Sequence, residues 1–145
     1  MEYYPPVGFH FKVDFSAISS QEMDARFQSV SGLSVEIQNE DRIEGGENRF
    51  THQLPLRSRY STLTLKRGLV QDSAVIQWCR EAFENFQFKP VNLIVSLQNV
   101  KHEPVKSWNI IHAWPAKWSV SDFNAEENTL VIETLDLNYR YFNLL

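Results

Sequence analysis

The chain has 145 residues, of which 43% are hydrophobic and 22% charged, and its formal net charge is −4 at pH 7. These values are typical of one globular domain and exclude an intrinsically disordered chain. Lysines and arginines are scattered along the sequence, so it lacks the basic surface that non-specific nucleic-acid binding requires. We therefore interpret residues 1–145 as a single domain that does not read DNA sequence.

The cysteine content and the hydropathy of the sequence indicate the cellular compartment in which the chain folds. Cys79 is the only cysteine, which excludes an intramolecular disulfide framework and indicates a reducing compartment. The N-terminus lacks the basic and then apolar pattern of a secretion signal, and no apolar run approaches the ~20 residues of a membrane span. We expect the chain to fold in the cytoplasm without inserting into a membrane.

The first third of the chain has strand patterns. Apolar residues occupy every second position of residues 9–15, which predicts a half-buried first strand. Residues 16–25 are polar and predict a connection or a single helical turn. Alternation resumes over 27–37, where Gly32 indicates a bulge or a change of direction.

Residues 40–50, EDRIEGGENRF, form a charged insert between stretches of ordinary strand pattern. The insert contains four acidic residues, two arginines and the pair Gly45-Gly46. A catalytic loop, a ligand clamp and a contact surface for another copy of the protein are all compatible with this composition. The rest of the sequence has to decide among them.

A third strand over 61–68 precedes the only convincing helix. Asp72 or Ser73 is a suitable N-cap, and Pro90 prevents the helix from continuing. The apolar positions at helical spacing are Val75, Ile76, Trp78, Cys79, Ala82, Phe83 and Phe86. This broad apolar stripe predicts a helix packed against the sheet, with Cys79 as a buried and inert thiol.

The C-terminal part returns to strand patterns. Strands are predicted over 91–99, 105–114, 117–123 and 128–142, the second and third separated by Pro115. Apolar residues change parity within the last run, which predicts a slip near Glu133. About seven strands and one helix, without βαβ alternation, predict a mainly β fold: an antiparallel β-sandwich or barrel with one flanking α-helix.

Motifs that carry chemistry are not found in this sequence. The four histidines, His10, His52, His102 and His112, lack metal-site spacing. The Gly45-Gly46 pair lacks the downstream glycine, lysine and helix of a phosphate-binding loop. Neighbouring acids such as Glu126 and Glu127 are typical of a solvated surface. We therefore expect no catalytic residues, no metal and no cofactor.

Charges at the ends of strands are the remaining signal. Arg57, Arg59, Lys66 and Arg67 flank the third strand, whereas the insert supplies Glu40, Asp41, Glu44 and Glu47. These charges either solvate the surface of one molecule or form complementary halves of a head-to-tail interface between copies, which can close into a ring. In the second case the insert is a docking arm, and Gly45 and Gly46 supply its backbone freedom.

Five strings in a fixed order make this chain resemble a known family. They are FQSVSGLSVEI, EGGENRF, LPLRSRYSTLTLKRGL, HAWPAKWSVSDFNAEEN and VIETLDLNYRYF. With these strings, which run from about Phe9 to Phe142, the sequence resembles the tail-tube proteins of contractile phages and of phage-tail-like contractile injection systems. The resemblance implies a tail-tube and Hcp-like β-barrel, closed into six-membered rings that stack into a hollow tube inside a contractile sheath, with no catalytic role.

The resemblance also implies contacts and partners. Glu44, Gly45, Gly46, Glu47, Asn48 and Arg49 would reach towards a neighbouring ring, Lys66 and Arg67 would lie near a subunit boundary, and Ala113 to Trp118 would form a structural corner. Partners would be further copies or a paralogue, the sheath, baseplate proteins, and a protein effector or DNA in the lumen. Assembly would begin in the cytoplasm and end in a phage tail or in an extracellular or cell-anchored injection particle.

Two departures from the family pattern leave alternatives open. Leu56 stands where a glycine is typical, and the predicted helix exits through the aromatic sequence NFQFKP. The chain could build the long tube or be a tube initiator at the baseplate. A different alternative is a monomeric β-sandwich module that binds a ligand with exposed rings, since 13% of the residues are aromatic.

Overall fold

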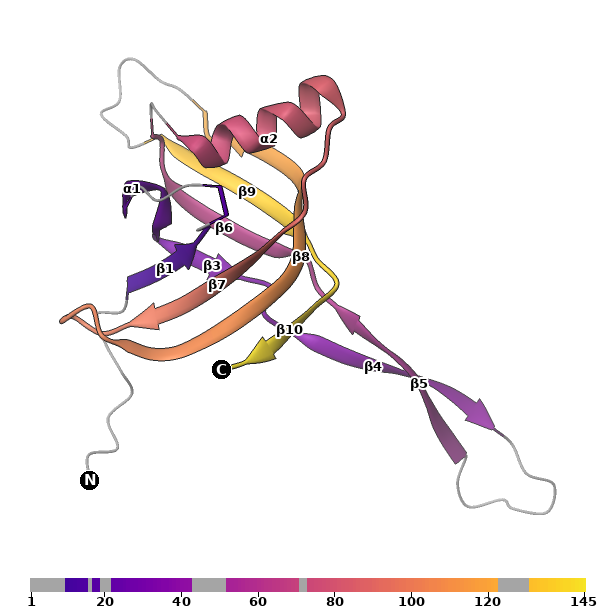
Figure 1. Ribbon diagram of the computed structural model, residues 1–145. Coiled ribbons are helices and arrows are strands. Elements are labelled where there is room, and N and C mark those ends of the chain that lie inside the picture. Colours follow the sequence, from indigo (N-terminus) through magenta and orange to yellow (C-terminus); the bar gives the residue numbers. More distant parts are fainter. Residues whose placement is uncertain (1–9, 16, 19–21, 43–51, 71–72, 123–130) are drawn as a thin grey trace.

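The computed structural model describes residues 10–15, 17–18, 22–42, 52–70, 73–122 and 131–145. Within these ranges the chain forms ten β-strands and two α-helices (Figure 1). In chain order they are β1 (His10–Asp14), α1 (Glu22–Ala25), β2 (Arg26–Phe27), β3 (Ser29–Ser31), β4 (Val35–Arg42), β5 (His52–Tyr60), β6 (Leu63–Gly68), α2 (Ala74–Asn85), β7 (Val91–Gln98), β8 (Pro104–Val120), β9 (Ile132–Asn138) and β10 (Tyr141–Leu144).

One antiparallel sheet curls into a closed barrel. Its strand order is β2-β1-β7-β8-β9-β6-β3, and the two end strands are successive pieces of the segment 26–31. That segment pairs with β1 through Phe27 and with β6 through Val30, and the backbone N–H of Gln28 donates to the carbonyl of Lys66 at 2.8 Å. The backbone groups of the barrel strands are therefore largely satisfied within one molecule.

The core fills the barrel and extends to α2. Inward positions of β1, β6, β7 and β9 alternate with exposed ones, as period-2 patterning requires. The helix contributes Val75, Trp78, Cys79 and Ala82 to the buried set. Three predicted stripe residues are not part of it: Ile76 is half-buried, Phe83 is 45% exposed and Phe86 is 80% exposed. The helix ends at Asn85, and Phe86 adopts the left-handed conformation at the C-cap.

The predicted mainly β barrel with one principal helix is confirmed, but two details differ from the sequence interpretation. Pro115 does not separate two strands, because β8 runs without interruption through residues 104–120. Pro115 lies in the part of β8 that pairs with β9 rather than with β7. The pairing with β9 shifts register next to it, at Ala116, and a proline is tolerated at such a bulge because it has no backbone N–H to donate. The predicted corner over 113–118 is thus a bulged strand that changes partners.

The slip predicted near Glu133 is wrong. Strand β9 keeps a regular alternation in which Glu133, Leu135 and Leu137 all point inward. The inward position at the start of β9 is occupied by the carboxylate of Glu133 instead of an apolar side chain. This interrupts the apolar alternation in the sequence although the strand itself is regular. The change of direction comes later, at Tyr139 and Arg140, before β10 pairs with β8.

Candidate assembly surfaces

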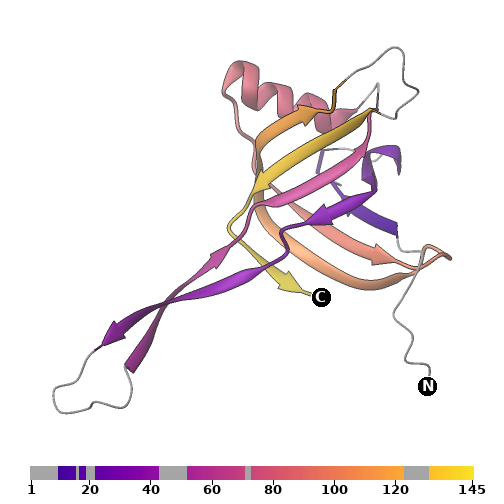
Figure 2. The ribbon, with the colours of Figure 1, turned by 180° about the vertical axis from the view of Figure 1, so that it is seen from behind.

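The hairpin of β4 and β5 extends away from the barrel as a separate two-stranded sheet (Figures 1 and 2). It begins at Gly32, whose φ of 93° belongs to the left-handed region that favours glycine. A Cβ at Gly32 would lie 1.9 Å from the carbonyl oxygen of Thr62, so any side chain there would collide with the backbone between β5 and β6. The sequence signal at Gly32 is confirmed as the point where the chain leaves the barrel.

The part of the hairpin next to the barrel has one apolar face and one charged face. Residues directly opposite each other in the ladder share a face, which places Val35 with Tyr60 and Ile37 with Ser58. The other face pairs Glu36 with Arg59. Val35 is 49% and Ile37 64% exposed, so the apolar face is not covered by the described part of this molecule.

Strand β10 continues this exposed apolar surface. It pairs with β8 along one edge only, with Tyr141 opposite Ile111 and Leu144 opposite Trp108. The ring of Tyr60 contacts that of Phe142, with centroids 5.1 Å apart in an edge-to-face arrangement. In the described part of the chain, β4, β5 and β10 each have an outer edge without a partner strand, and such edges are sites for pairing with another chain.

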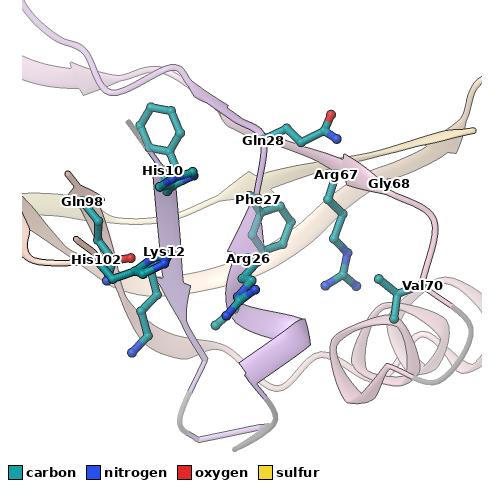
Figure 3. A pocket seen from close by; sticks show the side chains of 12 residues that line it. His10, Lys12, Arg26, Phe27, Gln28, Arg67, Gly68, Val70, Gln98 and His102 are labelled. Atoms are coloured by element: carbon teal, nitrogen blue, oxygen red, sulfur yellow. The ribbon is translucent and has the colours of Figure 1, made fainter. Parts of the chain in front are cut away.

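A basic groove has a volume of about 720 Å³ (Figure 3). Strand β1 and the turn after β7, which contribute to its lining, lie at the end of the barrel away from the hairpin (Figure 1). The polar lining of the groove comes from β1, β2 and the residue after it, β6, the end of β7 and the turn that follows β7: His10, Lys12, Arg26, Gln28, Arg67, Gln98 and His102. The imidazole rings of His10 and His102 stack with centroids 5.3 Å apart. No acidic residue lines the groove within the described ranges.

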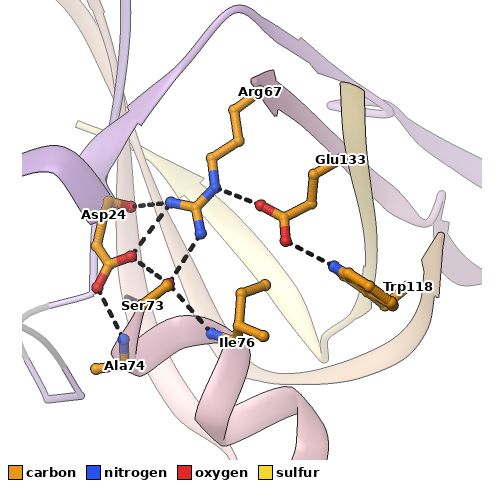
Figure 4. Close-up of polar contacts among 7 residues, drawn as sticks. All are labelled: Asp24, Arg67, Ser73, Ala74, Ile76, Trp118 and Glu133. Carbon is orange, nitrogen blue, oxygen red and sulfur yellow. Dashed lines mark hydrogen bonds and ion pairs between the residues drawn. The ribbon is translucent and has the colours of Figure 1, made fainter. Parts of the chain in front are cut away.

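A buried ionic cluster lies behind the groove and is centred on Arg67 (Figure 4). The Arg67 Nε donates to Glu133 Oε2 at 2.8 Å, its Nη1 to Asp24 Oδ1 at 3.3 Å, and its Nη2 to Ser73 Oγ at 2.9 Å. The second oxygen of Glu133 accepts a hydrogen bond from Trp118 Nε1 at 2.8 Å. All three charged residues are nearly inaccessible, so this cluster connects α1, β6, β9 and α2 inside the subunit.

The same cluster caps helix α2. The Ser73 hydroxyl accepts from the backbone N–H of Ile76 at 3.2 Å and donates a short hydrogen bond to Asp24. The other oxygen of the Asp24 carboxylate accepts from the N–H of Ala74 at 3.0 Å. A carboxylate and a hydroxyl thus satisfy N–H groups that have no partner within the helix. This confirms Ser73 as the N-cap; Asp72, the other N-cap candidate, lies outside the described residues.

The residues predicted to contact neighbouring subunits lie in different settings. Glu44 to Arg49 lie outside the described residues. Arg57 and Arg59 lie on β5, a strand that the sequence interpretation missed, and are exposed, as is Lys66 on β6. Arg67 is 3% exposed and its guanidinium is bound within the subunit, so it is not available on the surface described here. Its role in this structure is to connect elements of the fold.

The described residues contain no arrangement suited to metal binding, since no group of three or more His, Cys, Asp or Glu lies close enough to hold an ion. No helix in the described ranges is long and apolar enough to span a membrane. Burial, with a smaller contribution from Glu133, raises the pKa of the Cys79 thiol to about 12, while Arg67 opposes the shift. The thiol is therefore protonated and unreactive near neutral pH, as predicted.

Comparison with known protein families identifies the family to which this chain belongs. Residues 7–143 match the family model described as T4-like virus tail tube protein gp19, which is nearly the whole chain. The chain belongs to this tail tube family. The resemblance predicted from the five ordered strings is thereby confirmed. No curated protein is detectably similar to the chain in sequence.

Several solved structures share this fold. A chain in the anti-feeding prophage baseplate is 29% identical over 99% of this chain and 97% of its own length, with a TM-score of 0.84. A chain in the sheath–tube complex of the extracellular contractile injection system PVC is 22% identical over 99% and 93%, with a TM-score of 0.75. Hcp1 from Flavobacterium johnsoniae shares 12% identity over 94% and 93%, with a TM-score of 0.52, and so shares the fold.

The tail tube family and these neighbours are structural proteins, so this chain is a structural protein and not an enzyme. Its functional surfaces are accordingly contact surfaces rather than an active site. Sequence reasoning found the insert but not β5. The signal that could have indicated β5 is the short alternation of Leu54 and Leu56 with their neighbours, which is weak because no residue in the described part of β5 is buried.

Proposed function

We propose that this protein is a subunit of the inner tube of a contractile injection system or contractile phage tail. Copies close into six-membered rings, and the rings stack into a tube with a lumen that carries a protein effector or DNA. The observation that best supports assembly is the hairpin of β4 and β5, which projects from an otherwise closed barrel with free outer edges and an exposed apolar face. Such a feature is stabilised when another chain covers it.

The proposed contacts follow from the same surfaces. The end of β5 and strand β10 are in contact at the base of the hairpin, where the ring of Tyr60 packs against that of Phe142. Pairing of the outer edges of β5 and β10 with neighbouring copies would continue the sheet from one subunit to the next and give the tube stiffness. Glu44 to Arg49, Arg57, Arg59 and Lys66 would contribute polar contacts, with sheath and baseplate proteins as outer and terminal partners.

Size-exclusion chromatography with light scattering, followed by negative-stain electron microscopy, tests the proposal. The purified chain, alone or with its sheath and baseplate proteins, is expected to give rings with six-fold symmetry or rods of stacked rings. A chain that stays monomeric under all these conditions would contradict the proposal. Microscopy must also show a central channel, since solid fibres would indicate unspecific edge pairing instead.

A specific observation favours a baseplate-proximal role within the same tube. The chain in the anti-feeding prophage baseplate is 29% identical, whereas the chain in the PVC sheath–tube complex is 22% identical. A tube initiator and a tube-body protein differ in copy number, because an initiator fills one or a few rings and a body protein fills the whole length. Quantitative mass spectrometry of intact particles, with the sheath protein as internal standard, distinguishes the two roles.

A further inference from the structure

The hairpin of β4 and β5 is joined to the barrel by two short connections and by one cluster of aromatic rings. We propose that the two connections form a hinge and that Tyr60, Tyr139 and Phe142 are positioning residues, an aromatic latch that holds the hairpin in one direction relative to the barrel. The role of this latch in assembly rests on the proposed tube function. The latch itself is a property of a single subunit.

The two connections interrupt one ribbon of paired strands that runs from the barrel into the hairpin. In the barrel Ser31 of β3 lies opposite Thr64 of β6, and in the hairpin Val35 lies opposite Tyr60. Residues 32–34 and 61–63 lie between these two ladders, so the two arms are equally long and the register is the same on both sides. The interruption is therefore a bend in a ribbon of constant register.

Hydrogen bonds at this bend hold the arms of the hairpin together but do not fix its direction. The N–H of Ser34 donates to the carbonyl of Gly32 in its own arm at 2.8 Å, and the N–H of Ser61 donates to the carbonyl of Ser34 at 3.2 Å. A groove of about 500 Å³ lies beside the bend, lined in part by Ser34, Tyr60 and Thr62. Small backbone rotations in the two connections can therefore redirect the hairpin, as hinge residues do.

The aromatic latch extends from the hairpin to the barrel. Tyr60, the last residue of β5, packs edge-to-face against Phe142 at 5.1 Å and against Tyr139 at 5.9 Å between ring centroids. The rings of Tyr139 and Phe142 lie 6.2 Å apart and both pack against the hydrophobic core. Strand β10, which carries Phe142, lies beside the base of the hairpin in both views (Figures 1 and 2). One ring of the hairpin is thus connected to the core through two others.

Polar contacts between the bend and the barrel are weaker restraints than these rings. The Tyr139 hydroxyl donates to the carbonyl of Gly32 at 3.5 Å, and the Thr62 hydroxyl donates to Asn138 Oδ1 at 3.3 Å. Both distances are long for hydroxyl donors, which usually lie about 2.7–2.8 Å from their acceptors. The ring contacts therefore contribute most of the restraint on the direction of the hairpin.

The latch also connects the hairpin to the C-terminal strand. Phe142 lies on β10, which pairs with β8 along one edge only in the described part of the chain. A shift of β10 would separate Phe142 from Tyr60 and release the hinge. Two proposed assembly surfaces, the hairpin and the edge of β10, therefore depend on the same ring contact. Holding the hairpin in one direction before association reduces the entropy that association costs.

Double electron–electron resonance tests the latch within one subunit. Spin labels are attached at Gln53→Cys on β5 and Lys106→Cys on β8, both exposed positions, in a Cys79→Ala background. Dilution with excess unlabelled chain of the same sequence suppresses distances between subunits. The chain with an intact latch should give one narrow distance distribution. Tyr60→Ala and Phe142→Ala should each widen the distribution at least about twofold, because the hairpin then samples several directions.

Matched variants control for the loss of a ring. Tyr60→Phe keeps the ring and should give the narrow distribution. Phe88→Ala removes a ring that also packs edge-to-face against two others, Phe86 at 4.9 Å and Trp114 at 5.7 Å, but lies between α2 and β7, and it should leave the distribution unchanged. Because Tyr60 is not part of the described hydrophobic core, Tyr60→Ala decides the result if Phe142→Ala does not fold.

The outcomes for the latch and for the tube are distinguishable. Equally narrow distributions for the wild-type chain and Tyr60→Ala, or a broad one for the wild-type chain, would overturn the latch and leave the tube proposal standing. If the released hairpin has the required direction about a tenth of the time, the alanine variants should associate about tenfold more weakly in sedimentation velocity. Wider distances with undiminished association would refute the role of the latch in assembly. A wild-type chain that never associates would contradict the tube proposal but not the distance measurement.

Discussion

Arg67 and Glu133 lie directly opposite each other on β6 and β9 and form an ion pair inside the barrel, with 2.8 Å between Nε and Oε2. Their side chains are 4% and 2% exposed. The pair is not isolated, because Asp24 binds the same guanidinium at 3.3 Å and connects it to the N-terminus of α2. Arg67 therefore joins a strand of the barrel to both helices, which is a structural role within the subunit.

Replacing Arg67 with methionine should strongly destabilise the fold. The substitution keeps much of the side-chain volume but removes the cation that the buried carboxylates of Asp24 and Glu133 share, and breaking a buried ion pair typically costs about 3–5 kcal/mol. Urea unfolding followed by tryptophan fluorescence measures this change. As the matched control, Arg80→Met removes an exposed ion pair with Glu84 and should cost at most about 1 kcal/mol. Equal effects of the two substitutions would contradict the structural role of Arg67.

This cluster also shows where the sequence could and could not be interpreted. The period-2 pattern located β1, β6, β7 and β9 because each has an apolar face in the core. Glu133 breaks that pattern since its inward position requires the partner Arg67, which lies 66 residues away in the sequence. A charged residue whose burial depends on a distant partner looks like a change of parity, so the regular strand was interpreted as slipped.

Strand β5 of the hairpin and the basic groove were not predicted from the sequence, and the reasons are related. Residues 52–60 form a strand with no buried residue in its described part, and its apolar alternation is limited to Leu54 and Leu56 on either side of a proline, which is too short to indicate a strand. The groove combines His10, Lys12, Arg26 and His102, which come together only through the pairing of β1 with β2 and β7. The insert itself was recognised from its charge and glycines, because these features are local in the sequence.

Substituting Gly32 with alanine should destabilise the junction between barrel and hairpin. The residue has a φ of 93°, and an added Cβ would lie 1.9 Å from the Thr62 carbonyl oxygen, so the backbone must move. We expect the free energy of unfolding to fall by at least about 2 kcal/mol, because the strain of a left-handed backbone conformation and the collision with the backbone both act against the substitution. Gly68→Ala is a suitable comparison because its φ is not positive. Similar unfolding midpoints for both variants would rule out a special requirement at Gly32.

The thiol of Cys79 should be unreactive in the folded protein. Burial raises its pKa to about 12, so the thiolate fraction at pH 8 is on the order of 10⁻⁴. Ellman's reagent should therefore react with the native chain orders of magnitude more slowly than with the chain unfolded in guanidinium. Rapid modification of the native protein at pH 8 would show that α2 opens readily or that the thiol is accessible.

Stability should decrease in alkaline solution. Burial raises the pKa of Cys79 from 9.0 and that of Tyr139 from 10.0, each to about 12, and the nearby Tyr60 adds to the shift of Tyr139. The unfolded chain therefore releases these protons at lower pH than the folded chain, so stability is intact below about pH 9 and is lost progressively towards about pH 12. Melting temperatures measured from pH 7 to 11 test this. The Tyr139→Phe variant should show a smaller decrease above pH 10, and an unchanged slope would contradict the assignment.

Deleting Gly45 to Asn48 should separate folding from assembly. These residues belong to the segment between β4 and β5, and within the described residues no side chain of either strand is part of the hydrophobic core. The shortened chain should keep a cooperative melting transition within a few degrees of the wild type, because loop length affects stability only weakly. It should nevertheless fail to form stacked rings in negative-stain images. A variant that instead loses its cooperative transition would show that the insert supports the barrel, and the docking role proposed for it would then be wrong.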